Sequence, residues 1–303
     1  MQHREPSPGR HPVHVPVLVD AVLEWLQPRP GGLYVDATVG AGGHAERILE
    51  ACGPDGQLVG IDRDPEALEA AGRRLSPYTS RVRLVGGDFR HLRDLLQEAG
   101  VREADGILFD LGVSSLQLER AERGFSFHLP GPLDMRMDPR QPQTAADLVN
   151  GLPENQLAEL IQRYGEEPFA RRIARSIVRR RPLRTTTDLV EAVQAAVPRS
   201  RWPRRIHVAT RTFQALRIAT NQELDALEAA LAQVPDVLRP GARVVVISFH
   251  SLEDRLVKQA FRSDPSLRPL IRKPVRPGRE EVRQNPRARS ARLRAAERVE
   301  AVR

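Results

Sequence analysis

Residues 35–44, with the sequence VDATVGAGGH, limit the possible folds of this chain more than any other feature. A short apolar run ends at Asp36, a glycine-rich turn follows, and a helix-like segment begins at His44. A second apolar run, LVGID, ends about twenty residues later at Asp62. This order of strand, glycine turn, helix and acidic strand end is how parallel sheets hold nucleotide-like ligands. The turn therefore predicts an α/β fold with a ligand at one sheet edge.

The glycines of this turn have a physical purpose. Gly40, Gly42 and Gly43 allow a tight turn and let a ligand approach without a Cβ in the way. The helix N-terminus beyond them offers unpaired N–H groups to an anionic group, and Asp62 is placed to accept hydrogen bonds from ribose hydroxyls. The same stretch, read on to Ala45, also fits the dinucleotide fingerprint G-x-G-x-x-G/A. The turn alone therefore leaves three options: NAD, S-adenosylmethionine or no ligand.

Length and composition restrict the class of protein. With 303 residues, 40% of them hydrophobic, the chain suits one large domain or two moderate ones. No apolar run approaches bilayer length, and the opening MQHREPSPGR lacks the apolar core of a signal peptide. The single cysteine, Cys52, excludes an intramolecular disulfide and gives no metal cluster. We therefore expect a cytoplasmic protein with no membrane contact and no metal.

The net charge of +8 is unevenly distributed along the chain. Residues 171–184 contain seven arginines and no acid, and residues 199–217 contain six more, again without an acid. Arginine suits phosphate backbones through its bidentate fork, which favours RNA binding over a merely solvated surface. A composition bias toward arginine is the alternative, because lysine occurs only at positions 258 and 273. The candidates for RNA contact are Arg171, Arg172, Arg204 and Arg205.

Strand-like and helix-like segments alternate in the first third of the chain. Strands are expected at 33–36, 57–62, 81–85 and 105–110, and helices at 17–26, 44–51 and 65–75. This rhythm predicts a doubly wound parallel sheet, with ligands at the carboxyl ends of its strands. An acidic residue lies at or near each of those ends, and we expect all four to line one crevice: Asp36, Asp62, Asp88 and Asp110.

The rhythm stops after Asp110. Between residues 114 and 217 there is no convincing strand, and helical periodicity appears at 154–164, 169–180, 188–197 and 208–218. The sheet pattern then resumes: Thr220 to Glu223 reads as a capping box that opens a helix, a strand follows the turn Pro240-Gly241, and a helix begins near His250. The basic stretch NPRARSARLR reads as either extended or helical. We divide the chain into a flexible tail (1–13), a core (14–113 and 218–303) and an inserted helical domain (114–217).

Three further segments carry candidate chemistry. In GDF, Phe89 can cover one face of an adenine or pack in the core. In DLGVSSLQL, Asp110 can hydrogen-bond an amine and Gln117 can complete a cofactor pocket, although a serine-capped helix start explains the same letters. In ISFHSLEDR, His250 can assist proton removal or have a structural role. Two aromatic residues of RGFSF, Phe125 and Phe127, can stack on a base or pack under their loop.

The chain resembles the bacterial RsmH family, also called MraW, over residues 14 to about 294. The glycine motif is shared with every class I methyltransferase, whereas three other motifs, DLGVSS, LDMRM and ISFHSLEDR, are far more specific. Their order and spacing also agree. The matching motifs are HVPVLVDAV, VDATVGAGGH, GIDRD, GDF, DLGVSS, RGFSF, LDMRM, TAADLVN, RTFQALRIATNQEL, ISFHSLEDR and NPRARSARLR.

The resemblance implies a class I, Rossmann-like methyltransferase core with an inserted all-helical domain. It implies methyl transfer from S-adenosyl-L-methionine to the N4 amine of a decoding-region cytidine in 16S ribosomal RNA, with that RNA or the small ribosomal subunit as partner. The wider class of amino-methyltransferases often has Asp/Asn-Pro-Pro-Tyr where this chain has Asp110-Leu111-Gly112-Val113, so the aromatic that would stack on the target base is absent there. The residues implied to contact the cofactor are Gly42, Gly43, His44, Asp62, Phe89, Asp110 and Gln117.

The implied chemistry gives each candidate a role. The N4 lone pair of cytosine is delocalised into the ring, so an acceptor at the N4–H, for which we select Asp110, would free it and help to remove the proton. His250 or a water would take that proton finally. The alternatives are an NAD-dependent dehydrogenase, an RNA-binding protein with a vestigial cofactor site, and a methyltransferase acting on another RNA, DNA or protein amine. The sequence leaves the oligomeric state open, a homodimer included.

Overall fold

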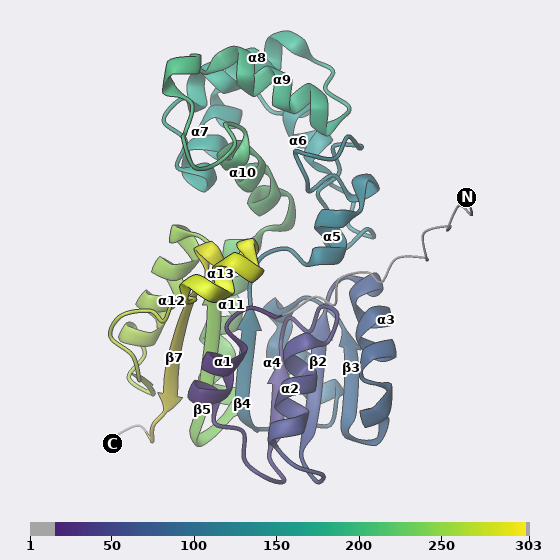
Figure 1. Cartoon of the computed structure of the whole chain (residues 1–303), viewed down its shortest axis with the longest axis vertical. Helices are drawn as coiled ribbons and strands as arrows, with labels where there is room; N and C mark the ends of the chain where they lie inside the picture. Colours follow the sequence, from purple (N-terminus) through teal and green to yellow (C-terminus); the bar gives the residue numbers. More distant parts are fainter. Residues whose placement is uncertain (1–15, 301–303) are drawn as a thin grey trace, which may run out of the picture.

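The computed structural model of this chain describes residues 16–300 (Figure 1). The expected tail, residues 1–13, lies outside the described residues. In Figure 1 the lower half is a twisted sheet with helices on both faces, and the upper half is a group of helices standing over one edge of that sheet. This arrangement places the helical group above the strand ends where the sequence predicts a ligand.

The sheet has seven strands in the order β3-β2-β1-β4-β5-β7-β6. The first five in this order are parallel, which confirms the predicted α/β core, whereas β7 pairs antiparallel with β5 and β6 antiparallel with β7. The sheet is therefore parallel where the sequence predicts it, with two antiparallel strands added at one edge. The strands are β1 (Leu33–Asp36), β2 (Gln57–Asp62), β3 (Val82–Gly86), β4 (Ala104–Asp110), β5 (Leu238–Ser248), β6 (Leu267–Pro269) and β7 (Arg292–Arg298).

Alternate side chains of the strands pack on opposite faces, because the side-chain period of a strand is two. Within β4, Ile107 and Phe109 belong to one apolar cluster and Leu108 to another, and all three are fully buried. Residues of α4, α11 and α12 complete the first cluster, and residues of α1, α2 and α3 the second. Both faces of the central strands are thus covered, as a parallel sheet requires.

The helices over the sheet begin where the sequence supplies caps. At the start of α3, for example, the Asp64 carboxylate accepts a hydrogen bond from the Glu66 backbone N–H (3.1 Å), and Pro65 occupies the first helical position. Helix α4 was not predicted; its seven residues are too few to show a clear helical period. The core helices are α1 (Val19–Leu26), α2 (Gly43–Ala51), α3 (Pro65–Arg74), α4 (Leu92–Glu98), α11 (Glu223–Val237), α12 (Ser251–Ser263) and α13 (Arg279–Gln284).

The helical group between β4 and α11 has an apolar core of its own, separate from the two clusters on the sheet. Figure 1 shows α8 and α9 at the end of the molecule farthest from the sheet, and α10 leading back to it. Helix α10 runs through residue 217, where we expected the insert to end. The helices of this group are α5 (Ser115–Glu119), α6 (Ala145–Gly151), α7 (Glu154–Gly165), α8 (Ala170–Arg180), α9 (Thr186–Ala196) and α10 (Thr210–Asn221).

Two local predictions are corrected by the structure. Thr220 does not open a helix; it lies in the last turn of α10, and Gln222, in the left-handed conformation, separates α10 from α11. Asn221 explains the difference, because its side chain accepts from the Met137 N–H (2.7 Å) and donates to the Met135 carbonyl (2.7 Å), which fixes the end of α10. The basic stretch near the C-terminus is both helical and extended: a 3-10 turn, η5 (Pro286–Ser290), is followed by β7.

Candidate functional site

The glycine turn is joined to the two strands beside β1. The Ala37 N–H donates to the Leu108 carbonyl of β4 and the Val39 N–H to the Ile61 carbonyl of β2, both at 2.9 Å. Gly42 has a φ of 82°, a left-handed value that favours glycine, and α2 begins at Gly43. These bonds hold the turn at the carboxyl edge of the sheet, where the sequence predicted it.

Asp62, at the end of β2, stands beside this turn. One carboxylate oxygen accepts from the Gly40 N–H (2.9 Å) and the other from the Asp64 N–H (2.9 Å). Burial raises the pKa of Asp62, although these two hydrogen bonds oppose the shift. Its oxygens have further lone pairs that can accept from hydroxyls, the role predicted for this residue.

Three titratable side chains meet beneath the turn. His44 Nε2 lies 3.4 Å from Asp110 Oδ2, and the side chain of His44 is 6% exposed. Burial lowers the pKa of His44, but the hydrogen-bonding and charge interactions with Asp110 and the charge of Asp36 outweigh it, so the pKa is raised. Burial raises the pKa of Asp36 to about 7 against the attraction of His44. The arrangement favours a protonated imidazole between two carboxyl groups, at the ends of β1 and β4.

Several atoms of this group have no hydrogen-bond partner. They are Nδ1 and Nε2 of His44 and Oδ1 of Asp110, all buried. The Asp110 backbone is fixed, since its N–H donates to the Thr38 hydroxyl (2.6 Å). Buried polar atoms without partners are rare in proteins and mark places where a ligand supplies the missing bond.

Gln117 is buried and its carboxamide is already engaged. Its Nε2 donates to Asp64 Oδ2 (2.9 Å), and its Oε1 accepts from the Ser114 N–H (3.1 Å) in a capping box at the start of α5. The serine-capped helix start that we considered is therefore present. Arg123 approaches the same Asp64 carboxylate at 2.9 Å, which joins the loop after α5 to the sheet edge. Gln117 keeps one amide hydrogen for a ligand, so its predicted cofactor role stays a prediction.

Phe89 begins the 3-10 turn η2 (Phe89–His91), directly after Asp88. Its ring meets Phe109 edge to face, with 5.8 Å between centroids, and it is half-buried against the core. Both readings of Phe89 thus have a physical basis: one part of the side chain packs in the core and another part is accessible at the ligand edge.

His250 lies at the predicted strand end but is enclosed. Its Nδ1 accepts from the Glu253 N–H (3.4 Å) as the N-cap of α12, and its Nε2 lies 3.1 Å from Glu253 Oε1. Burial raises the pKa of Glu253, but His250 and Arg217 outweigh it and lower the pKa overall. Arg217 in turn holds Glu223 through two hydrogen bonds of 2.8 Å. The cap bond at Nδ1 favours a structural role for His250, although its buried Nε2 has no hydrogen-bond partner.

The same cluster includes three residues, Glu223, His250 and Glu253, whose donor atoms lie within 4.8 Å of one another. The Arg217 guanidinium donates to both oxygens of Glu223, which leaves this carboxylate fewer lone pairs for a metal ion.

Phe249 is a residue that the sequence reasoning missed. A Cβ on Gly112 would lie 3.4 Å from the Phe249 ring, so this ring stands beside the loop that follows Asp110. Strands β4 and β5 are neighbours, with Asp110 paired to Ile247, which explains how their ends meet. The signal was present in ISFHSLEDR, where we considered only the histidine. Part of the Phe249 side chain also packs against the second apolar cluster of the sheet.

The predicted RNA-contact arginines lie in two places. Arg171 and Arg172 are exposed on α8, and Arg204 and Arg205 are exposed in the segment before α10. Figure 1 puts α8 at the far end of the insert, so the two pairs belong to different parts of it.

The two aromatic residues of the RGFSF loop are engaged inside the insert. Phe125 is 6% exposed within the apolar core, so it offers no face to a base. Phe127 stacks on His207, with 4.8 Å between ring centroids and planes 9° apart, and meets Phe213 edge to face. For both phenylalanines we gave packing under the loop as the alternative to base stacking. Phe125 packs in this way.

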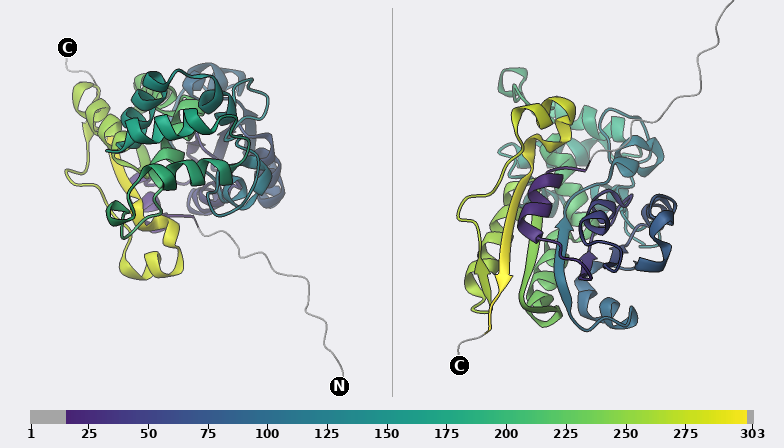
Figure 2. Two further views of the ribbon diagram at one scale, coloured as in Figure 1. Left: turned by 90° about the horizontal axis from the view of Figure 1, so that it is seen from above. Right: turned by 60° about the horizontal axis from the view of Figure 1, so that its bottom comes forward.

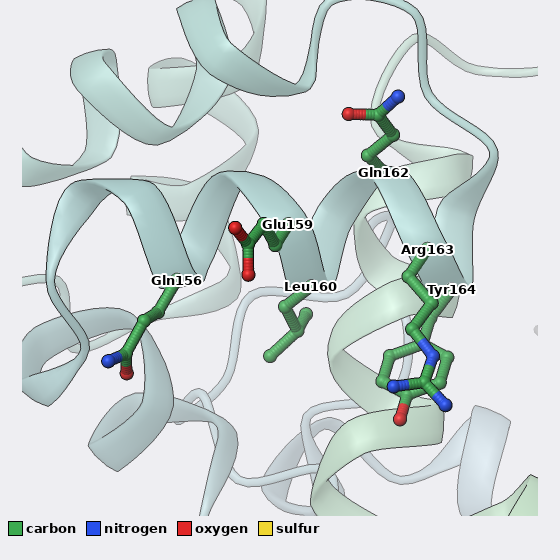
Figure 3. A pocket seen from close by; sticks show the side chains of 6 residues that line it. All are labelled: Gln156, Glu159, Leu160, Gln162, Arg163 and Tyr164. Atoms are coloured by element: carbon green, nitrogen blue, oxygen red, sulfur yellow. The ribbon is translucent and has the colours of Figure 1, made fainter.

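A surface hollow lies elsewhere, on α7 of the insert (Figure 3). None of the predicted site residues lines it, and its six side chains all come from one helix. The residues that line the hollow are Gln156, Glu159, Leu160, Gln162, Arg163 and Tyr164.

Among residues 16–300, no helix is long and apolar enough to cross a membrane.

The chain is similar to known proteins over nearly its whole length. The model of the MraW methylase family matches residues 11–299. The ribosomal RNA small subunit methyltransferase H of Geobacter sulfurreducens is 54% identical over 307 residues, covering 94% of this chain and 99% of that protein. The protein of the same name from Symbiobacterium thermophilum is 50% identical, with 95% and 97% covered. A solved rRNA methylase from Streptococcus thermophilus superposes with a TM-score of 0.44 at 11% identity, covering 93% of this chain and 94% of that one.

Proposed function

Because this chain belongs to the MraW methylase family, we propose that it transfers a methyl group from S-adenosyl-L-methionine to the N4 amine of a cytidine in 16S ribosomal RNA. The target is the cytidine equivalent to position 1402, in the decoding region. The observation that carries this proposal is the pair of His44 and Asp110 at 3.4 Å, with buried atoms that have no hydrogen-bond partner. Comparisons over nearly the whole chain support the RNA substrate.

The residues at the sheet edge fit this cofactor. Asp62 presents carboxylate oxygens for ribose hydroxyls, Phe89 presents a half-buried ring for adenine, and Gly42 and Gly43 leave the turn without side chains. Gln117 contributes its remaining amide hydrogen. The unpaired oxygen of Asp110 completes the set. When bound, the cofactor supplies an electrophilic methyl group on a positively charged sulfur.

Asp110 is the residue we propose to act on the target amine. Its Oδ1 is buried and has no partner, so it can accept a hydrogen bond from the cytosine N4–H and draw the nitrogen lone pair out of conjugation. His44 keeps the other oxygen in place and stabilises the charged carboxylate. Transfer of the methyl group to N4 would require this nitrogen to lose a proton. Since His250 is engaged with Glu253, we assign that proton to Asp110 and then to water.

Substrate recognition is the proposed task of residues 114–217. The target base must leave its stack to reach Asp110, and single-stranded bases are commonly held on aromatic faces. We propose that the Phe249 ring stacks on the cytosine from beside Gly112. The exposed arginines predicted to contact RNA, Arg171, Arg172, Arg204 and Arg205, would bind the phosphates around it.

The experiment that tests this function uses small ribosomal subunits from a strain that lacks the gene. The purified protein is incubated with these subunits and S-adenosyl-L-methionine, and the RNA nucleosides are then separated by mass spectrometry. We expect one new N4-methylcytidine per subunit, mapped to the decoding region. A methyl group on another base, on another RNA or on protein would refute the assigned substrate.

A further inference from the structure

Four exposed arginines from two distant parts of the sequence form a rim beside the candidate site, which we call the arginine rim. Arg204 and Arg205 precede α10 in the insert, and Arg287 and Arg289 lie in the turn η5 near the C-terminus. Arg289 Nη2 donates to the Arg205 carbonyl at 3.5 Å, which brings the two parts together. Figure 1 shows the yellow C-terminal segment lying between the sheet and the helical insert, and Figure 2 shows it from two other directions.

The C-terminal part of the rim is held in place from below. Ala288 is fully buried in the apolar cluster of the sheet, so its two neighbours, Arg287 and Arg289, are directed outward. Arg287 donates to the Ser115 hydroxyl and to Glu119 at 3.2 Å, both on α5. Because α5 begins five residues after Asp110, these contacts anchor the rim at the border of the site.

The insert part of the rim is also rigid. The Trp202 indole donates to the Val197 carbonyl (3.0 Å), and the Arg199 guanidinium lies over the Trp202 ring, 5.5 Å from its centroid. These contacts fix the segment that leads to Arg204 and Arg205. Side chains on a fixed backbone lose less entropy when they bind a partner.

The charges of the rim are mostly unneutralised. Arg287 pairs with Glu119, but within residues 16–300 no carboxylate forms an ion pair with Arg204, Arg205 or Arg289. Arg287 and Arg289 belong to the sequence NPRARS, within the strongly basic stretch after Phe261 whose charge also favours RNA. Exposed guanidinium groups without acidic partners, beside the sheet edge where we propose that the base binds, suit the phosphates next to that base.

We propose that the arginine rim binds the RNA phosphates that flank the target cytidine, with Arg289 and Arg205 as its centre. This inference rests on the proposed function and assigns a substrate contact to the C-terminal turn. Each phosphate contact releases a counterion, so the rim contributes to affinity in a salt-dependent way. It contributes to the binding of RNA and leaves the chemistry at Asp110 unchanged.

The test measures the affinity of a fluorescently labelled RNA hairpin that carries the target cytidine, by anisotropy between 50 and 300 mM KCl. For Arg289→Ala we expect the dissociation constant at 100 mM KCl to rise about 3- to 10-fold, and the slope of log affinity against log salt to decrease by about 0.7. Arg205→Ala should raise the dissociation constant and decrease the slope to a similar extent. This variant keeps the backbone carbonyl that accepts the hydrogen bond from Arg289, so the contact between the two parts of the rim is retained. Arg289→Lys should restore most of the slope.

The matched control is Arg283→Ala, on the exposed face of α13, where the side chain pairs with Glu280 at 2.7 Å. We expect its RNA affinity and slope to equal those of the parent. The affinity for S-adenosyl-L-methionine should stay within twofold in every variant, and kcat should stay within twofold in Arg283→Ala. Parent-like slopes in both Arg289→Ala and Arg205→Ala would overturn the rim, even if the parent methylates 16S ribosomal RNA. A parent that makes no N4-methylcytidine would instead refute the proposed function.

Discussion

Replacing Asp36 by asparagine should stabilise the cofactor-free protein more at pH 8 than at pH 5. Asp36 is 1% exposed at the end of β1, and burial raises its pKa to about 7 from an unfolded value of 3.8. At about 1.4 kcal/mol per pKa unit, this difference corresponds to about 4 kcal/mol. Above pH 7 the folded protein must hold a buried carboxylate, and the unfolded protein pays no such cost.

The sign follows from proton binding. Between about pH 4 and pH 7 the folded state holds a proton on Asp36 that the unfolded state has released, so the free energy of unfolding falls as pH rises through this window. His44 acts in the same direction, because its raised pKa gives stability that is present below 6.5 and lost above the folded value. Asparagine removes the pH dependence that is due to Asp36 and part of that due to His44. We therefore expect the free energy of unfolding to rise by about 2–4 kcal/mol at pH 8.

Urea titrations followed by circular dichroism, at pH 5 and pH 8, measure this difference. Asparagine keeps the oxygen that accepts from the Thr38 N–H (3.2 Å), so the turn itself should persist. The control is Asp55→Asn, at an exposed turn between α2 and β2, for which both curves should follow the parent. An equal gain for Asp36→Asn at both pH values, or a loss at pH 8, would refute the reasoning from burial.

Three further substitutions test the site. Asp110→Ala should lower kcat about 10²- to 10⁴-fold with an unchanged melting temperature, and near-normal turnover would remove Asp110 from the mechanism. Phe249→Leu should raise the KM for RNA about 10-fold or more through lost stacking without altering cofactor affinity in calorimetry; a parent-like KM would contradict the stacking. Gly43→Ala should lower the free energy of unfolding by about 1–3 kcal/mol in urea titrations, because its Cβ would lie 2.5 Å from Pro16 Cγ; an unchanged midpoint would show that the segment yields freely.

The sequence predicted those elements whose signals are local. Strands β1 and β2 have the predicted bounds, because a glycine turn and an acidic strand end mark each limit. Strand β7 was left undecided, since it forms by pairing with β5 and β6, strands that lie well before it in the sequence. The Thr220 capping box failed for a related reason: Asn221 makes contacts with Met135 and Met137, and these decide where α10 ends. Long-range contacts overrule a local pattern wherever the local preference is worth only about 1 kcal/mol.

For the site, the sequence identified residues better than it identified their partners. Asp62, His44 and Asp110 occupy the predicted sheet edge because each follows directly from a strand or turn signal. The sequence H-S-L-E indicates the contact between His250 and Glu253, because a spacing of three residues is typical of a helix cap. Histidine is an uncommon capping residue, however, so the pattern is easily overlooked. The position of Phe249 beside Gly112 depends on the pairing of β4 with β5, which no local pattern contains.

The motifs GIDRD and GDF contain more than cofactor residues, and the structure explains why. Arg63, which follows Asp62, donates to the carbonyl of Asn221 (3.0 Å) at the end of α10 and to Asp88 (3.3 Å). Asp88 in turn precedes Phe89. Residues predicted to hold the ribose and adenine thus alternate along the chain with residues that hold the insert. A generic methyltransferase core needs only the first set; a core that must keep an RNA-binding insert in register with its cofactor needs both. The specificity of these short motifs therefore reflects the attachment of the insert as much as the chemistry of methyl transfer.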